Sequence, residues 1–414
     1  MGRGVRMLAR ARRPWHDAAV LLSVTVDNCD WGAIEGASPA RARPLLVTND
    51  FPPQVGGIER FTLELARHLP GAAVLAASHP DARAHDRAER FPIYRAPSSF
   101  MLPTSRTRGV IEDAIADHGA SIVVFVSPLP LSILGTEVSV PWTVIAHGAE
   151  LTVPAHLPGI GGVIRGRLTE APALFAVSQH TAGQLRELLG EGCPPVRLVR
   201  NGVPLETFRP DLDGSAVRKR LGLGDAPVLG CVGRLVPRKG QDRLIEALPL
   251  IHEEVPEARL LIVGDGRLRR RLERSSRAMP DGAIVLAGAV EPEELGRHFA
   301  AVDVFAHPNR SRWFGLEQEG FGVIFLEAQA CGKPVIAGHS GGSPEAIDEG
   351  RTGLLVDGDD IGEVAGAAVA LLKDPGRAAA MGAAGRRLVE REFGWPTVAG
   401  RFARDLAEAT AAAS

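Results

Sequence analysis

The chain has 414 residues, of which 45% are hydrophobic and 23% are charged, and its formal net charge is −2. That length allows two domains with separate cores, and a charge near zero argues against nucleic acid as a partner. No apolar run reaches the roughly 18–20 residues that a membrane-spanning helix needs, and the cysteines form no CxxC pair: Cys29, Cys193, Cys231 and Cys331. We therefore expect a cytoplasmic protein without a zinc site or a disulfide framework.

Residues 1–43 show no pattern typical of a domain. The first 13 residues contain five arginines and no acid, and a short apolar stretch follows Asp17. This order resembles a signal peptide, but the apolar stretch is brief and carries Ser23 and Thr25. We interpret residues 1–43 as a disordered extension or as the product of a start codon assigned too early.

From Pro44 onward, apolar strands alternate with polar loops and helices. Strands are predicted at 44–50, 72–78, 121–127, 142–148 and 173–179. A helix is predicted at 58–69, where Ile58, Phe61, Leu65 and Leu69 recur at helical spacing. Continuously apolar strands that alternate with helices indicate a parallel sheet covered on both faces. We assign residues 44–215 to this first domain.

The same pattern restarts after residue 215 and predicts a second domain at 216–395. Its strands are predicted at 227–235, 258–266, 283–290, 302–308, 333–338 and 353–358, and its helices at 240–254 and from 361 onward. The final segment, 396–414, is predicted to be a helix that returns to the first domain. The fold class is therefore α/β, with two Rossmann-like open parallel sheets facing each other across a cleft.

The stretch VGRLVPRKGQ places Arg234 and Lys239 in a loop between a strand and a helix. An arginine fork and a lysine point charge can both bind one diphosphate. The alternative is a solvated turn with two surface cations.

A second candidate lies in EGFGVIFLEAQA, which contains Glu319 and Glu327. Gly322 allows a tight turn into a helix, so the amides of Phe321, Gly322 and Val323 would be unpaired and could bind a phosphate. The two carboxylates lie far enough apart to reach different parts of an elongated ligand. Alternatively, Glu319 is a favourable charge at the helix N-terminus, and Glu327 is a solvated or ion-paired residue on the face of the helix.

Two weaker signals occur in the first domain. Gly56 and Gly57 precede a helix after the first strand, and His147 ends a strand, which would place both near the cleft. A core or capping role for His147 is an equal alternative. The sequence VGDGRL lacks the third glycine of a dinucleotide-binding fingerprint, and we interpret it as a loop near a nucleotide base.

Together these motifs resemble the retaining glycosyltransferases of family 4, which have the GT-B fold. VGRLVPRKG, VGDG, EGFGVIFLEAQACGKPVIAG, GGSPEAI and GRTGLLV occur in the order that the family shows, and Glu319 and Glu327 match its E-x7-E signature. LLVTNDFPPQVGGIERF and the insert NRSRWFGLEQEGFG are most similar to actinobacterial mannosyltransferases that elongate phosphatidylinositol mannosides from GDP-mannose.

The resemblance implies roles for the candidate residues. Arg234 and Lys239 would hold the donor diphosphate with the amides at 321–323, and Glu319 would bind a hydroxyl of the transferred sugar. Glu327 would bind the ribose and the backbone of Val290 the base. His147 and the Gly56–Gly57 loop would line the acceptor side near the reacting carbon. Such enzymes need no metal.

The expected activity is therefore transfer of a hexose, mannose from GDP-mannose, to a lipid-linked acceptor with retention of anomeric configuration. Alternatives are another nucleotide sugar with a soluble or polysaccharide acceptor, a nucleotide-sugar epimerase of the same fold, and a noncatalytic binding protein. The E-x7-E pair together with the Arg/Lys loop disfavours the last of these.

An arginine-rich stretch suggests how the enzyme could reach a lipid. Residues 81–108 contain six arginines and three acids beside the apolar sequences FPIY and SSFMLP. Basic and apolar side chains together favour an anionic bilayer. We expect this edge to dock peripherally on the inner face of the cell membrane, unless it is an ordinary solvated surface.

Overall fold

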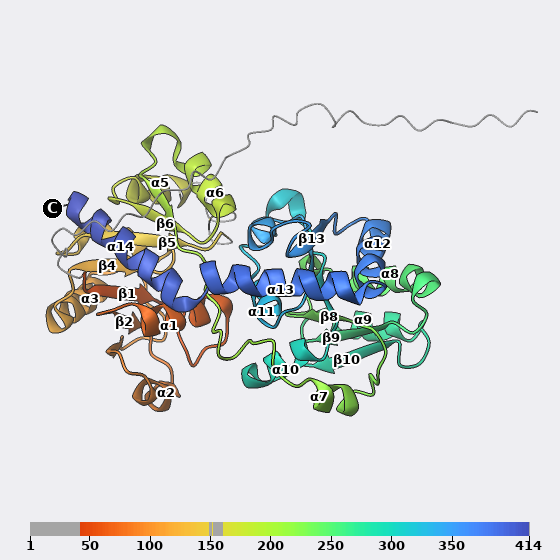
Figure 1. Cartoon of the computed structure of the whole chain (residues 1–414). Helices are drawn as coiled ribbons and strands as arrows, with labels where there is room; N and C mark the ends of the chain where they lie inside the picture. The colour runs from red at the N-terminus through yellow and green to blue at the C-terminus, as the bar shows by residue number, and fades with distance from the viewer. Residues whose placement is uncertain (1–41, 149–150, 152–159, 414) are drawn as a thin grey trace, which may run out of the picture. The chain divides into compact units, whose positions relative to one another are not determined.

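The computed structural model describes residues 42–148, 151 and 160–413, which are coloured in Figure 1. The expectation for residues 1–43 thus lies almost wholly outside the described residues. Within those residues the chain forms two parallel sheets, as the alternation of apolar strands and helices predicted.

The first sheet has seven described strands in the order β3-β2-β1-β4-β5-β6-β7. They are β1 (Pro44–Thr48), β2 (Ala73–Ala76), β3 (Ile93–Arg95), β4 (Ile122–Phe125), β5 (Trp142–Ala146), β6 (Leu174–Ala176) and β7 (Val196–Leu198). The helices are α1 (Gly57–His68), α2 (Ala82–Ala88), α3 (Ser105–His118), α5 (Ile160–Leu168) and α6 (Gln179–Leu189), with 3-10 turns η1 (Leu131–Glu137) and η3 (Gly190–Gly192). Leu45 pairs with Ala73 on one side and Val123 on the other, so β1 lies inside the sheet.

The sequence analysis missed β3 and β7, the two edge strands of this sheet. Each has only three residues, and all of these are half-buried. A strand this short, with Arg95 or Arg197 in it, lacks the continuous apolar run that revealed the central strands.

The second sheet has six described strands in the order β10-β9-β8-β11-β12-β13. They are β8 (Val228–Val232), β9 (Arg259–Val263), β10 (Ile284–Gly288), β11 (Val304–His307), β12 (Val335–Gly338) and β13 (Gly353–Val356). Leu229 of β8 pairs with Leu260 of β9 and with Val304 of β11. The strand order reverses between β8 and β11, and ligands of open parallel sheets bind outside the carboxyl ends of the strands at such a point.

The helices of the second half surround this sheet and then continue to the C-terminus. They are α7 (Ser215–Arg220), α8 (Gln241–Glu254), α9 (Arg269–Ser276), α10 (Leu295–Ala300), α11 (Val323–Ala330), α12 (Ile361–Leu372), α13 (Pro375–Glu392) and α14 (Trp395–Ala413). The 3-10 turns are η4 (Pro237–Lys239), η5 (Pro292–Glu294), η6 (Trp313–Gly315) and η7 (Ser343–Ala346). The change of sheet falls between β7 and β8, and we keep 215/216 as the proposed domain boundary.

Helix α14 contacts elements of the first sheet. Its Asp405 and Glu408 carboxylates lie 3.2 and 2.6 Å from Nη1 of Arg197 in β7. The Phe402 ring packs edge-on against Phe175 of β6, with 4.8 Å between the ring centres. These contacts tie the C-terminal segment to the first half of the chain.

A chain of phenylalanine rings fixes α11 against the second sheet. Phe305 of β11 packs edge-on against Phe299 of α10 and Phe325 of α11, with ring centres 5.4 and 6.2 Å apart. All three side chains are fully buried. Edge-to-face contacts of this kind add to the free energy that burial supplies, and they set the position of the N-terminus of α11.

Close packing of α13 against the segment after α11 depends on a glycine. A Cβ atom at Gly382 would lie 1.9 Å from the Gly332 carbonyl oxygen. The same addition at Gly366, in the exposed part of α12, would meet no atom of the described residues within 4 Å beyond its own helix backbone. The two helical glycines therefore have different reasons to be present.

We predict opposite effects of alanine at these two positions. Gly382→Ala should lower the free energy of unfolding by about 1–3 kcal/mol, because α13 must move away from a backbone carbonyl. Gly366→Ala should raise it by about 0.5–1 kcal/mol, because alanine loses less backbone entropy in a helix. Urea denaturation of both variants measures the difference, and equal effects would contradict this packing.

Candidate functional site

The loops after β8 and β11 supply most of the predicted residues on the second sheet. The loop after β8 carries Arg234 and, in the 3-10 turn η4, Arg238 and Lys239. The segment after β11 carries Asn309 and leads to Glu319 before α11. Because β8 and β11 are neighbours, both segments leave the sheet at its topological switch point.

Glu319 lies at the centre of a buried charged cluster. Its Oε2 is 2.6 Å from Lys239 Nζ, 2.7 Å from Arg238 Nη1 and 2.9 Å from Asn309 Nδ2. Burial by itself would raise the pKa of this carboxyl, but the charges of Lys239 and Arg238 lower it to about 2. Glu319 is therefore a stable carboxylate held by two cations and an amide.

Arg238 is a site residue that the sequence analysis missed. The turn η4 directs the consecutive side chains of Arg238 and Lys239 toward the same carboxylate oxygen. Arg234, the predicted partner of Lys239, is instead exposed, and its carbonyl accepts a hydrogen bond from Gln241 Nε2 at 3.2 Å. Adjacent basic residues in the stretch PRKG were the available signal, but spacing alone could not show which of them turns inward.

Glu327 has a different environment, although it belongs to the same signature. It lies on α11 with 3% of its surface exposed, and its Oε1 is 2.9 Å from Nη1 of Arg60 on α1. Burial raises the pKa of Glu327, and Arg60 only partly offsets that effect. The structure therefore joins the second carboxylate to the first half of the chain.

The N-terminus of α11 has the geometry that the glycines predicted. Gly322 has a φ of 85°, and a Cβ there would lie 2.5 Å from the Phe325 ring. No side chain caps the helix, and among the described residues the amides of 321–323 make no backbone hydrogen bond outside the helix. Such amides, together with the helix dipole, favour an anion.

His147, predicted on the acceptor side, lies beside the same segment. Its ring packs edge-on against Phe61 of α1, 5.0 Å between centres, and its Nε2 is 2.9 Å from the Val126 carbonyl oxygen. A Cβ at Gly320 would lie 2.8 Å from the His147 carbonyl oxygen. The backbone at His147 therefore closely approaches the residue that follows Glu319.

The structure gives less information on the remaining predicted residues, Gly56, Gly57 and Val290. Gly56 caps α1 in an extended conformation, and a Cβ added to Gly57, the first residue of that helix, would meet no atom within 4 Å in the part of the chain that the structure describes. Val290 is half-buried two residues after β10. The Gly264 amide donates to the Gly288 carbonyl at 2.7 Å, so the loops after β9 and β10 lie together.

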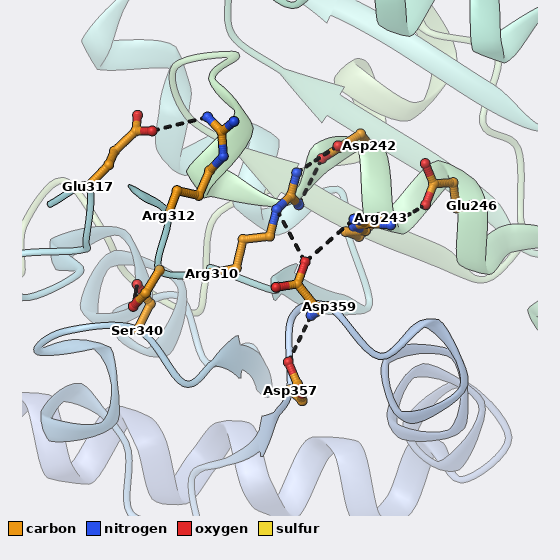
Figure 2. Close-up of polar contacts among 10 residues, drawn as sticks. Asp242, Arg243, Glu246, Arg310, Arg312, Glu317, Ser340, Asp357 and Asp359 are labelled. Atoms are coloured by element: carbon orange, nitrogen blue, oxygen red, sulfur yellow. Dashed lines mark hydrogen bonds and ion pairs between the residues drawn. The ribbon is translucent and has the colours of Figure 1, made fainter. Parts of the chain in front are cut away.

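A buried ion pair anchors the segment between β11 and Glu319 (Figure 2). Both guanidinium Nη atoms of Arg310 bind the carboxylate of Asp242 on α8, at 3.0 and 2.7 Å. Each side chain is only 8% exposed. A bidentate pair in this environment is strongly directional, and it sets the conformation from which Asn309 and Glu319 reach the cluster.

Two further ion pairs shape this segment. Arg312 and Glu317 face each other across a short antiparallel bridge, with 3.1 Å between Nη1 and Oε2. Asp357 and Asp359 directly follow β13 with D-x-D spacing, a motif at a strand end that the sequence analysis overlooked. Asp359 Oδ1 lies 3.5 Å from Arg310 Nε and 3.4 Å from Arg243 Nη2, as Figure 2 shows.

The described residues hold neither a candidate metal site nor a candidate membrane span. No group of three or more His, Cys, Asp or Glu side chains is arranged to hold a metal ion in that part of the chain. Likewise, no described helix combines the length and hydrophobicity that a membrane span requires.

Family models match both halves of the chain. Residues 55–207 match the model described as glycosyltransferase family 4, and residues 226–374 match the model described as glycosyl transferases group 1. The second match includes Lys239, Glu319 and Glu327.

Curated relatives and a solved structure extend these matches over most of the chain. A GDP-mannose-dependent monoacylated α-(1-6)-phosphatidylinositol monomannoside mannosyltransferase of Corynebacterium glutamicum is 40% identical over 89% of this chain and 98% of its own. A GDP-mannose-dependent α-(1-6)-phosphatidylinositol monomannoside mannosyltransferase of Mycolicibacterium smegmatis is 38% identical, covering 87% and 97%. The crystal structure of HepE from Anabaena with UDP has a TM-score of 0.74 at 21% identity, covering 88% and 100%, and supports the fold.

The two carboxylates should respond to pH with opposite sign. The folded-state pKa of Glu319 lies below its usual 4.5, at about 2, so its stabilisation is present above pH 4.5 and is lost as the pH falls toward 2. We predict that Glu319→Gln lowers the free energy of unfolding at pH 7 by about 3 kcal/mol, and that this loss shrinks over that interval. Urea denaturation from pH 7 to pH 3 measures it.

Glu327→Gln is the matched control. Because burial raises the pKa of Glu327, its charged form opposes folding at neutral pH, and the amide should cost little there. A destabilisation by Glu319→Gln that stays constant with pH would contradict the charge pairing described for Glu319.

Proposed function

Because the chain belongs to glycosyltransferase family 4, we propose that it transfers mannose from GDP-mannose to a phosphatidylinositol mannoside, with retention of anomeric configuration. The observation that carries this proposal is the identity of 38–40% to mannosyltransferases of that specificity over 87–89% of the chain. The buried Glu319–Lys239 cluster supports it, because it places cations and a carboxylate beside an uncapped helix N-terminus.

The cluster suggests how the donor binds. Lys239 and Arg238 share one oxygen of Glu319, and a diphosphate would compete with that carboxylate for the two cations. Arg234, exposed in the same loop, and the amides of 321–323 would complete the diphosphate site. The exchange would free Glu319 to accept a hydrogen bond from a hydroxyl of the mannose.

The remaining roles follow the order of groups in the donor. Glu327 would bind the ribose hydroxyls after exchanging its contact with Arg60, and the backbone at Val290 would contact guanine. His147 and the Gly56–Gly57 loop would line the acceptor side. These assignments place the reacting carbon between Glu319 and His147, whose segments meet at Gly320.

The chemistry would need charge stabilisation at the departing diphosphate. The bond between the mannose anomeric carbon and the phosphate oxygen breaks as the acceptor oxygen attacks from the same face, through an oxocarbenium-like state. The leaving phosphate oxygen takes the acceptor proton. Lys239, Arg234 and Arg238 supply the positive charge without a metal, and loss of one such group costs on the order of 10²–10³ in rate.

The assay that tests this proposal supplies GDP-mannose with and without phosphatidylinositol monomannoside. We expect mannose in the lipid only when both are present, and a fall of about 10²–10³ in kcat for Lys239→Ala and Arg234→Ala. Gly366→Ala, which is remote from these loops, is the control. Transfer from another nucleotide sugar, or turnover of the donor without acceptor, would support the other transferase or the epimerase instead.

The surface of the first half is consistent with a lipid-borne acceptor. Arg83, Arg87, Arg90 and Arg106 are exposed without an acidic partner within 4 Å among the described residues. Phe100 and Leu102, in the same stretch of sequence, are 55% and 56% exposed. Arg83 and Arg87 also line a shallow cavity of about 420 Å³. We propose that this edge docks on an anionic membrane surface.

The structure removes two arginines from that docking surface. Arg95 is only 15% exposed and binds Asp86 at 2.7 Å, and Arg108 lies 3.6 Å from Glu137. They were counted with the basic stretch from sequence alone, but each has an acidic side chain within 4 Å; only the Arg95 pair is largely buried, since Arg108 and Glu137 are 47% and 42% exposed.

Vesicle co-sedimentation tests the docking surface. The protein should bind vesicles that contain anionic lipid, and binding should weaken as salt rises. Replacing Arg83 and Arg106 with glutamate should reduce binding several-fold, whereas Arg95→Glu would instead disturb the fold. Binding that is unchanged in the double variant, or absent at low salt in the parent, would rule out this surface.

A further inference from the structure

His307, the last residue of β11, is a buried histidine whose ring has no hydrogen-bond partner among the described residues. Its exposed fraction is 0%, and neither Nδ1 nor Nε2 has a partner in that part of the chain. The ring instead packs edge-on against Phe305 and Phe325, at 6.1 and 5.9 Å between centres. Buried polar atoms are nearly always hydrogen-bonded, and an exception needs an explanation.

The histidine adjoins the loop that carries the cationic residues. Among the described residues, and apart from its chain neighbours, a Cβ placed on Gly233 would have two atoms within 4 Å, His307 Cε1 at 3.5 Å and Nε2 at 3.8 Å. The φ of Gly233 is 146°, a conformation that favours glycine. At Gly233, immediately before Arg234, no side chain therefore stands between the backbone and the Nε2 edge of His307.

Burial, together with the two neighbouring cations, favours the neutral form of the His307 ring. Burial lowers the pKa well below the usual value, Lys239 and Arg238 lower it further, and Glu319 only partly opposes them. A neutral imidazole has one N–H donor and one acceptor nitrogen. Near two cations that are expected to hold an anion, the group still missing is an acceptor oxygen for that N–H.

We propose that His307 Nε2–H donates a hydrogen bond to a phosphate oxygen of the nucleoside diphosphate in the donor, across the bare face of Gly233. His307 is thus a further residue of the diphosphate site. The inference rests on the proposed function, because it needs a diphosphate at the loop of Arg234 and Lys239. The ring becomes reachable when the diphosphate displaces the Glu319 carboxylate from Lys239.

The contribution of His307 can be isolated with GDP and GMP as probes. Calorimetry gives the affinity of the full-length protein for each, and their ratio reports on the interactions of the second phosphate. His307→Phe keeps the ring volume but has no N–H, and it should lower the GDP-to-GMP affinity ratio about tenfold. Affinity for GMP should change much less, and kcat for transfer should fall with KM for acceptor unaltered.

Two conservative variants separate this role from packing. The side-chain amide of His307→Gln can reach the position of Nε2 and should recover most of the ratio. The side-chain amide of His307→Asn is too short to do so, and this variant should have the same lowered GDP-to-GMP affinity ratio as His307→Phe. His298→Phe is the control, because His298 is equally buried but contacts Arg220 and the Glu294 carbonyl. It should reduce stability without changing the ratio.

The outcomes distinguish the two proposals. If the parent protein binds neither GDP nor its mannose derivative, the proposed function fails. If the parent binds GDP and the ratio is the same in the phenylalanine, glutamine and asparagine variants as in the parent, the assignment of His307 is wrong. Should the phenylalanine variant not fold, GDP-to-GMP ratios in the glutamine and asparagine variants that both equal the ratio of the parent would have the same meaning.

Discussion

The two cations on one oxygen of Glu319 are the interaction on which the site depends. Lys239 and Arg238 approach Oε2 to 2.6 and 2.7 Å in an environment where each of the three side chains is at most 24% exposed. Two buried cations without a counter-charge would be strongly destabilising. We propose that the carboxylate keeps assembled a positive site that a diphosphate can later occupy, so that the ligand would exchange one anion for another.

The surrounding fold is arranged to hold that cluster in place. Arg310 and Asp242 fix the start of the segment that leads to Glu319, while Phe305 and Phe325 fix the start of α11 beyond it. Bidentate ion pairs and close-packed aromatic rings both restrict geometry. Between these anchors, Gly320 and Gly322 allow a backbone path that a side chain would block.

The two carboxylates of the E-x7-E signature are therefore electrostatically different groups. Cations hold the pKa of Glu319 far below its usual value, whereas burial raises that of Glu327 despite Arg60. This difference is consistent with the proposed roles of Glu319 beside the charged leaving group and of Glu327 in binding neutral hydroxyls. Arg60 comes from α1, so if Glu327 binds the ribose as proposed, donor binding would also change a contact with the first half of the chain.

The order of the central strands and main helices, the two parallel sheets and the family could all be predicted from sequence, because apolar periodicity, glycine placement and short motifs are local properties. Residue type also singled out Lys239 and Glu319, which the structure brings into contact, and Glu327 as candidates whose roles stay predictions. The sequence could not show that Arg238 rather than Arg234 contacts Glu319, since a single 3-10 turn decides which side chain points inward. Nor could it show the contact between Glu327 and Arg60, 267 positions apart, or the ring of His307 left unpaired among the described residues. Those features depend on which loops the tertiary structure brings together and on how much water it excludes, and no local pattern encodes either.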